Sequence, residues 1–310
     1  MMNDYTHSDR HTPQIGRLTK MAVNLSHQPF NFTGIEISPQ WESISETDPS
    51  PQYVDYTLKL LDTEGGEGIV TAHMPLGWYL NREMHIEFLG KISCITCGKR
   101  IKKTYGDGHC YPCFMDAPSA AECVIRPALC LAHKGQGRDL EWELKNHAQP
   151  HLVYLALSNK YKVGVTRDWP TRWVDQGAAD IQVIAETPYR QLAGQIELFL
   201  SQHYSDRTSW QRMLKGEVLQ GADLEAEVQR AQALLPSELS IYSEVKHTSL
   251  YLNYPIIKSI SRVKSIKLDK VSSHQGRLLG ARGQYLIFDG GTVVNLRAHT
   301  GYHVKISAID

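Results

Sequence analysis

Four cysteines have the spacing of a metal site, in the order Cys94-x2-Cys97-x12-Cys110-x2-Cys113. Two such pairs on tight turns can present four thiolates as a tetrahedron, and four sulfur ligands suit zinc better than other common ions. In zinc-finger peptides the bound metal contributes roughly 10–16 kcal/mol to folding at neutral pH. Two disulfides or ordinary buried cysteines are the alternatives, but the double pair favours zinc.

A second group of cysteines and histidines could bind another zinc ion. Cys123-x6-Cys130 precedes His147-x3-His151, and His133 is an alternative ligand. Histidines four residues apart on a helix can face one ion, as in sites with two cysteines and two histidines. Because the cysteine spacing is unusual and the two pairs are well separated, buried thiols and surface histidines remain the alternative interpretation.

Polar residues that can handle a phosphate group follow one another between residues 152 and 197. In chain order they are Tyr154, Lys162, Arg172 and Glu197, with Gly164 and Thr166 in the run that Lys162 begins. Taken singly, each is an ordinary strand or helix residue. Their order and spacing make a common site a better explanation than chance.

This order resembles the GIY-YIG nuclease superfamily, whose core is a small three-stranded antiparallel sheet with helices packed against it. Tyr154 matches the first motif tyrosine and Gly164 the motif glycine. Arg172 follows Gly164 by eight positions, as the catalytic arginine of that superfamily does. Glu197 matches its helix-borne metal-binding glutamate.

The resemblance implies a metal-dependent nuclease with Tyr154, Lys162, Arg172 and Glu197 as catalytic residues. A phenol can position the attacking water, a guanidinium can clamp a phosphoryl oxygen, and a carboxylate can hold magnesium or manganese. Two positions depart from the pattern: Lys162 replaces the second motif tyrosine and Gln176 replaces a frequent histidine. Lysine can bind phosphate, whereas glutamine cannot accept a proton. Nucleic-acid binding without cleavage is therefore the second interpretation, and a zinc-stabilised protein-interaction module is the third.

Most of the chain is also similar to an uncharacterised bacterial family of unknown function. The likeness combines the cysteine ribbon and the Cys/His cluster with three short sequences, at 162–167, 171–178 and 283–287. It implies that Lys162 and Gln176 are regular features of that group.

The elements that must position these residues indicate a multidomain α+β protein. Alternating apolar residues indicate strands near 54–60 and 84–88. Short strands are expected at 152–157, 161–165 and 181–185, with a helix over 192–203. Asp289-Gly290-Gly291 predicts a tight hairpin turn. The predicted domains are a flexible tail (1–20), an N-terminal β-rich domain (21–90), the zinc ribbon and Cys/His cluster (91–151), the GIY-YIG-like core (152–240) and a C-terminal β-rich segment (241–310).

The formal net charge is zero, but the charges are unevenly distributed. The range 36–67 contains eight acidic residues and one basic residue, 91–103 contains five bases and no acid, and 246–282 contains eight bases and one acid. Basic runs favour an anionic partner, here DNA or RNA, although solvated surfaces are the simpler alternative. In the ribbon the expected contacts are Lys99, Arg100, Lys102 and Lys103.

The composition is that of an ordinary globular protein, with 42% hydrophobic and 21% charged residues. The sequence contains no run of 18 apolar residues, so it predicts no membrane span. The N-terminal residues lack the apolar centre of a signal peptide. We therefore expect a cytoplasmic protein with reduced cysteines and no membrane partner.

Overall fold

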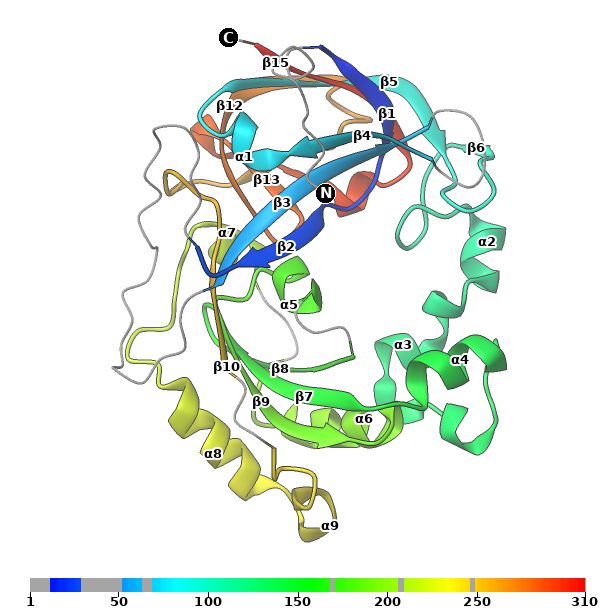
Figure 1. Cartoon of the computed structure of the whole chain (residues 1–310), viewed down its shortest axis with the longest axis vertical. Coiled ribbons are helices and arrows are strands. Elements are labelled where there is room, and N and C mark those ends of the chain that lie inside the picture. The colour runs from blue at the N-terminus through cyan, green and yellow to red at the C-terminus, as the bar shows by residue number, and fades with distance from the viewer. Residues whose placement is uncertain are drawn as a thin grey trace. The chain divides into compact units, whose positions relative to one another are not determined.

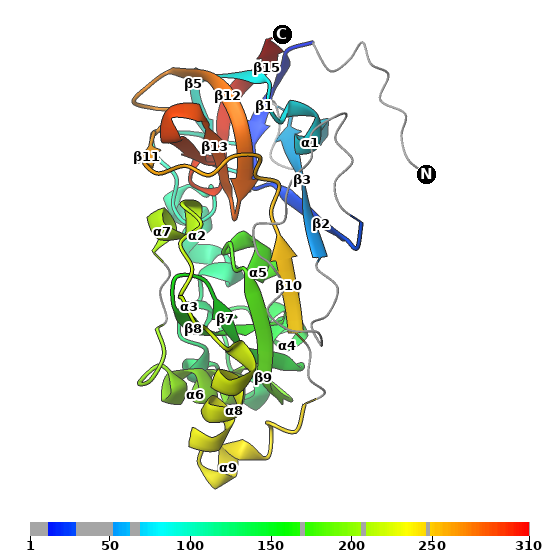
Figure 2. The same ribbon diagram turned by 90° about the vertical axis from the view of Figure 1, so that its left-hand side faces the viewer.

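A computed structural model describes residues 12–28, 52–62, 69–167, 171–205, 209–245 and 249–309 of the protein (Figures 1 and 2). The chain forms two compact units. Unit 1 comprises the N-terminal strands, the residues up to Met115 and the chain from Tyr254 onward. Unit 2 contains Asp116–Asn253. The protein is thus a mixed α/β protein.

Unit 1 is built on a large mixed sheet with the hydrogen-bonded order β11-β14-β13-β12-β5-β15-β1-β3. Most neighbours are antiparallel, but β11 and β14 are parallel. In addition, β2 and β4 pair with β3, and β6 pairs with β5. The strands are β1 Gln14–Leu18, β2 Ala22–Ser26, β3 Gln52–Leu61, β4 Val70–Pro75, β5 Glu83–Ser93, β6 Arg100–Ile101, β11 Lys264–Ser265, β12 Ser273–Arg282, β13 Tyr285–Phe288, β14 Thr292–Asn295 and β15 Tyr302–Ile309.

The core of unit 1 follows the predicted alternation of apolar side chains. Tyr56, Leu58 and Leu60 of β3 are buried, as are Met84 and Ile86 of β5. Alternate residues of a strand point to the same face, so these side chains line one side of the sheet. Short helical elements connect the strands: α1 Leu76–Tyr79, α2 Tyr111–Asp116, η5 Asp289–Gly291 and η6 Arg297–His299.

Unit 2 contains a small antiparallel sheet with the order β8-β7-β9-β10 (Figure 1). Its strands are β7 His151–Leu157, β8 Tyr161–Thr166, β9 Asp180–Thr187 and β10 Ser249–Asn253, which lies beside β9 (Figure 2). The helical elements are η2 Pro118–Ala120, α3 Glu122–Ile125, η3 Pro127–Leu129, η4 Ala132–Lys134, α4 Leu140–His147, α5 Thr171–Asp175, α6 Arg190–Leu200, α7 Trp210–Leu214, α8 Leu224–Leu234 and α9 Ser237–Ser240.

The helices α6 and α8 share one apolar core with this sheet. Val153 of β7, Val163 of β8 and Ile184 of β9 pack with Ile196 of α6 and Val228 of α8. All five side chains are fully buried. The face of the sheet occupied by Val153 and Val163 is therefore covered, and the residues between them in sequence, such as Tyr154 and Lys162, point the other way.

The two units group the predicted domain ranges differently. Most of the ranges 21–90 and 241–310 lies in unit 1, where β5 pairs with both β12 and β15. Residues 241–253, which include β10, belong to unit 2. The range 91–151 is divided, since the ribbon lies in unit 1 and the Cys/His cluster in unit 2. The predicted tail contains β1, while its first 11 residues lie outside the described residues. Most of the acidic range 36–67, and Lys246 of the basic range, also lie outside them. In the part of the chain that is described, no helix has the length and apolar character needed to cross a bilayer.

Candidate metal centres and active site

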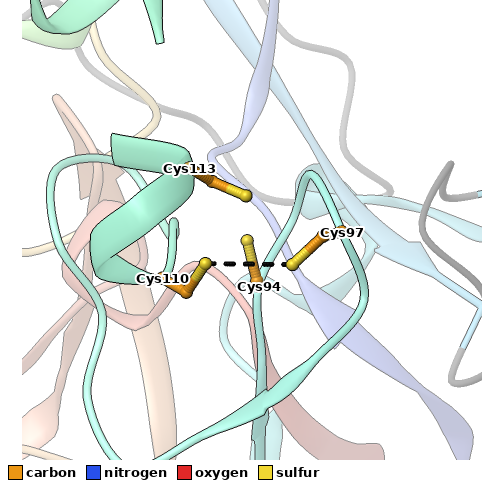
Figure 3. Close-up of side chains that lie close together, drawn as sticks. All are labelled: Cys94, Cys97, Cys110 and Cys113. Carbon is orange, nitrogen blue, oxygen red and sulfur yellow. Dashed lines mark hydrogen bonds between the residues drawn. The ribbon is translucent and has the colours of Figure 1, made fainter. Parts of the chain in front are cut away.

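The four cysteines of the predicted ribbon converge in unit 1 (Figure 3). Their sulfur atoms all lie within 4.8 Å of one another, and the sulfurs of Cys97 and Cys110 are 3.8 Å apart. With a zinc–sulfur distance of about 2.3 Å, two sulfurs of a tetrahedral site lie about 3.8 Å apart. All six cysteines of the chain are free, so the disulfide alternative does not hold. The group could hold a metal such as zinc.

Backbone amides favour the thiolate form of Cys94. Burial of this thiol raises its pKa, but hydrogen bonds from the backbone of Cys97, Cys110 and Thr96 outweigh burial and lower the pKa to about 6. The thiolate is the form that binds metal. A site closed by four protein sulfurs leaves no position for water or substrate, which is typical of structural zinc.

The ribbon is attached to the C-terminal part of unit 1. The guanidinium of Arg297 in η6 donates two hydrogen bonds to the carboxylate of Asp107, at 2.7 and 2.9 Å. Gly108 has a φ of +105°, and a Cβ at this position would lie 2.7 Å from Cγ2 of Thr300. Glycine is therefore needed both for the backbone conformation and for the close approach.

A second group of potential metal ligands lies in unit 2. Cys123 of α3, Cys130 after η3, and Glu143 and His147 of α4 are all buried, with ligand atoms within 4.8 Å of one another. Nδ1 of His147 is 3.5 Å from the sulfur of Cys130 and 3.7 Å from that of Cys123. The hydrogen bond from Cys123 lowers the pKa of Cys130 to about 4, although burial acts in the opposite direction. This group could also hold a metal such as zinc.

Glu143 takes the place that the sequence predicted for His151. Because α4 ends at His147 and His151 begins β7, the two histidines do not share a helical face. Their ring centroids are 6.5 Å apart, and burial lowers the pKa of His151 to about 4. The other predicted alternative, His133, stacks on the ring of Tyr189 at 4.3 Å and is not in the group. Glu143 and His147 are four residues apart on one helix, so their side chains lie on the same face. This spacing was present in the sequence and could have indicated Glu143 as a potential ligand.

The carboxylate of Glu143 is held in a prepared position. Its Oε1 accepts hydrogen bonds from the backbone N–H groups of Arg138 and Asp139, at 2.8 and 3.4 Å. A Cβ at Gly137 would lie 2.6 Å from Oε2, so glycine leaves the space that the carboxylate fills. Its Oε2 lies 3.8 Å from Nδ1 of His147. These contacts direct one carboxylate oxygen toward the other three ligands.

The segment that carries this second group is docked on helix α6. The guanidinium of Arg190 donates to the backbone carbonyls of Cys123 and Val124, at 3.0 and 2.9 Å. One turn further on, a Cβ at Gly194 would lie only 2.1 Å from the backbone nitrogen of Ala128. The beginning of α6 is thus fixed against the segment that carries Cys123 and Cys130, and the same helix carries Glu197.

On the small sheet, Tyr154 and Gly164 are direct partners across β7 and β8. The Tyr154 side chain is fully buried, and a Cβ at Gly164 would lie 2.6 Å from its hydroxyl oxygen. The ring of Trp173 from α5 contacts that of Tyr154 edge-on at 5.1 Å. Gly164 therefore leaves the space in which the tyrosine ring lies.

A polar network surrounds the Tyr154 hydroxyl. The side chain of Arg172 hydrogen-bonds to it, and the hydroxyl donates to Oε1 of Gln176 at 3.4 Å. The same oxygen accepts a hydrogen bond of 2.8 Å from Nζ of Lys162. Burial raises the pKa of Tyr154 to about 12, although the charge of Arg172 opposes this effect. The phenol is consequently neutral at physiological pH.

Glu197 lies within electrostatic range of this network. Burial raises the pKa of Tyr154 and lowers that of Arg190, and the charge of Glu197 acts upward on both pKa values. Among the described residues it does not belong to a group of three or more acidic, histidine or cysteine ligands. A cation at Glu197 would take most of its ligands from water and from a bound substrate, as magnesium commonly does.

Comparison with known proteins places the chain in a family. Residues 81–304 match the family model described as "Protein of unknown function (DUF2797)". The match includes both cysteine groups and the Tyr154 network. No curated protein and no solved structure matches the chain. Because the match covers well over half of its residues, the chain belongs to the DUF2797 family.

Proposed function

We propose that the Tyr154 network of unit 2 binds a nucleic-acid phosphate and hydrolyses the phosphodiester, as the GIY-YIG resemblance implies. The observation that carries the proposal is the hydrogen-bonded convergence of Tyr154, Lys162, Arg172 and Gln176 from β7, β8 and the α5 region. In this view the two cysteine-containing groups bind structural zinc.

Each side chain supplies a different part of the chemistry. Arg172 is exposed and uses only part of its five-donor guanidinium on Tyr154, so other N–H groups can bind a phosphoryl oxygen. Lys162 adds a second positive charge. The neutral phenol of Tyr154 is buried, and its hydrogen bonds hold Arg172 and Gln176 in position beside the phosphate. A divalent cation bound at Glu197 would lower the pKa of a bound water and stabilise charge on the phosphate.

The ribbon supports a nucleic-acid partner. Its four basic side chains in 99–103 are all exposed, and Nζ of Lys103 lies 4.8 Å from the ring centroid of Tyr105. Basic side chains interleaved with an aromatic ring can contact both the phosphate backbone and the bases. Binding through these residues would weaken steeply as salt concentration rises.

Nucleic-acid binding without cleavage is the second candidate, and one observation favours it. Tyr154 is fully buried, and its pKa of about 12 keeps the phenol protonated at pH 7. A protonated phenol is a poor acceptor for a proton from the attacking water. Gln176 cannot accept a proton either. If Lys162 does not take the proton, the site holds a phosphate but lacks a side-chain base.

The test is incubation of the purified protein with end-labelled single-stranded, duplex and branched DNA, and with RNA, with and without magnesium or manganese. The proposal predicts cleavage that needs the added cation and is lost in Arg172→Ala. Arg230→Ala is the matched control, because Arg230 is an exposed arginine on α8 of the same unit. The binding affinity for each substrate is measured in parallel.

The outcomes separate the candidates. Cation-dependent cleavage lost in Arg172→Ala but retained in Arg230→Ala supports the nuclease. Salt-dependent binding without cleavage, weakened in Arg172→Ala, supports the second candidate. Absence of both binding and cleavage would contradict both candidate functions. The zinc-stabilised protein-interaction module would then be the remaining interpretation.

A further inference from the structure

Unit 1 contains a pocket of about 760 Å³ that none of the functions above uses. The size is within the usual range for small-molecule sites. One side is formed by β12 and the η5 turn, through Arg277, Leu279 and Asp289. The other side is the segment 257–262, here named the strap.

The strap is held close to the sheet at both ends. Just before it, a Cβ at Gly280 would lie 2.3 Å from the carbonyl oxygen of Pro255. At its end, a Cβ at Gly291 would lie 2.1 Å from the carbonyl oxygen of Arg262. After the strap, β11 pairs with β14. Only glycines allow these approaches, so the pocket is fixed by the backbone.

Positive charge predominates around the pocket. Lys258 and Arg262 of the strap are exposed, and neither forms an ion pair with another described residue. Arg277 on the opposite side donates to the backbone carbonyl of Asn81 at 3.4 Å, and its Nε is 3.9 Å from a carboxylate oxygen of Glu83. The acid in the lining, Asp289, accepts a hydrogen bond from the backbone N–H of Arg277 at 3.2 Å.

Apolar side chains complete the lining. Ile257 and Ile260 of the strap and Leu279 of β12 offer a surface for a ring, next to the basic groups. Arginine and lysine are the side chains that most often bind phosphate, and the planar guanidinium can do so with two hydrogen bonds. A ligand with a phosphate at one end and an apolar ring at the other fits both parts of the pocket.

We propose that this pocket binds a phosphate-bearing ligand of nucleotide size, with Lys258 and Arg262 contacting the phosphate. The ligand is either a free nucleotide or a nucleotide unit of a single strand, which share this chemistry. The proposal uses residues of unit 1 alone and is independent of the nuclease proposed for unit 2.

Calorimetric titration of the full chain with ADP, adenosine and a short single-stranded DNA tests the pocket. We expect ADP to bind, inorganic phosphate to compete with it, and adenosine to bind at least roughly tenfold more weakly, because the phosphate contacts are charge-assisted. DNA that displaces ADP identifies the strand as the source of the phosphate, and ADP binding that DNA does not displace identifies the free nucleotide. No binding of either ADP or DNA, or equal binding of ADP and adenosine, would overturn the proposal.

Variants assign the binding to this pocket. The double change Lys258→Glu and Arg262→Glu should weaken ADP or DNA binding by roughly tenfold or more. Lys270→Glu is the control, since Lys270 is an exposed lysine of unit 1 outside the lining. If the double variant does not fold, the single change Lys258→Gln replaces it in the test. We expect Lys258→Gln to weaken binding less than the double change. Unchanged binding in a folded variant of either kind would show that the ligand binds elsewhere.

Discussion

Lys162 donates a hydrogen bond of 2.8 Å to Oε1 of Gln176. These are the two positions at which the chain departs from the GIY-YIG pattern, so the replacements are direct neighbours on the structure. Gln176 also links Lys162 to Tyr154, whose hydroxyl donates to the same oxygen at 3.4 Å. A charged donor and an amide acceptor therefore lie side by side next to the Tyr154 hydroxyl.

The hydrogen bond between Lys162 and Gln176 predicts that the two side chains act together. Lys162→Met should weaken nucleic-acid binding by roughly tenfold, because it removes one charged phosphate contact. Adding Gln176→Leu should cost little more than either change alone, since residues in one network are not additive. Binding affinities of the two single variants and the double variant measure the coupling.

Two observations would contradict this view. Additive effects of the two changes would show that the residues act separately. Unfolding of Lys162→Tyr, which we expect to alter activity without loss of the fold, would show that Lys162 has a structural role.

The second group of potential metal ligands predicts a specific zinc stoichiometry. Purified protein should contain two zinc ions per chain, with one lost in Cys97→Ala and the other lost or bound at least roughly tenfold more weakly in Glu143→Ala. His151→Ala is the matched control and should retain both ions, because His151 lies outside the group. Elemental analysis after dialysis gives the count. Zinc lost from His151→Ala but retained in Glu143→Ala would restore the ligand set predicted from the sequence.

The close approach of α6 to the segment that carries Cys123 and Cys130 predicts a large effect of a single methyl group. Gly194→Ala should lower the free energy of unfolding of unit 2 by about 1–3 kcal/mol, because a Cβ would lie 2.1 Å from a backbone nitrogen that cannot easily move. Gln195→Ala, at an exposed position of the same helix, should change stability little. Urea denaturation compares the two variants. Equal stability would mean that the segment is not docked there.

His303 predicts part of the acid sensitivity of unit 1. Burial, with Lys91 and Arg17 nearby, lowers its pKa from 6.5 to about 4. The folded state therefore favours the neutral ring, and this contribution to stability is complete above about pH 6.5 and is lost as pH falls toward 4. His303→Gln should lose less stability than the wild type between pH 7 and pH 5 in urea denaturation. An identical pH dependence of the two proteins would mean that His303 contributes nothing to acid sensitivity. Because loss of zinc would affect both proteins alike, the difference in stability between wild type and His303→Gln at each pH isolates the effect of His303.

Local elements could be predicted well from the sequence. The strands β7, β8 and β9, helix α6 and the hairpin at Asp289–Gly291 lie where apolar periodicity and glycines indicated them. The grouping of the four ribbon cysteines was also predicted, because two Cys-x2-Cys turns have few other uses.

Long-range relationships could not be predicted in the same way. The pairing of β5 with β12 and β15 joins residues between 186 and 226 positions apart, and no local pattern specifies such a partner. Because α4 ends at His147, Glu143 and not His151 lies next to the other three potential ligands. The proximity of Lys162 to Gln176 depended on the strand register and the position of α5 together.

The proposed function requires the Tyr154 network to hydrolyse a phosphodiester with a cation at Glu197. The most direct measurement is the cleavage rate of a nucleic-acid substrate against magnesium concentration for the wild type, Glu197→Gln and Glu225→Gln, an exposed control on α8. We predict magnesium-dependent cleavage in the wild type and the control, and a loss of roughly a hundredfold or more in Glu197→Gln. Equal rates in all three proteins, or cleavage that needs no divalent cation, would contradict the account.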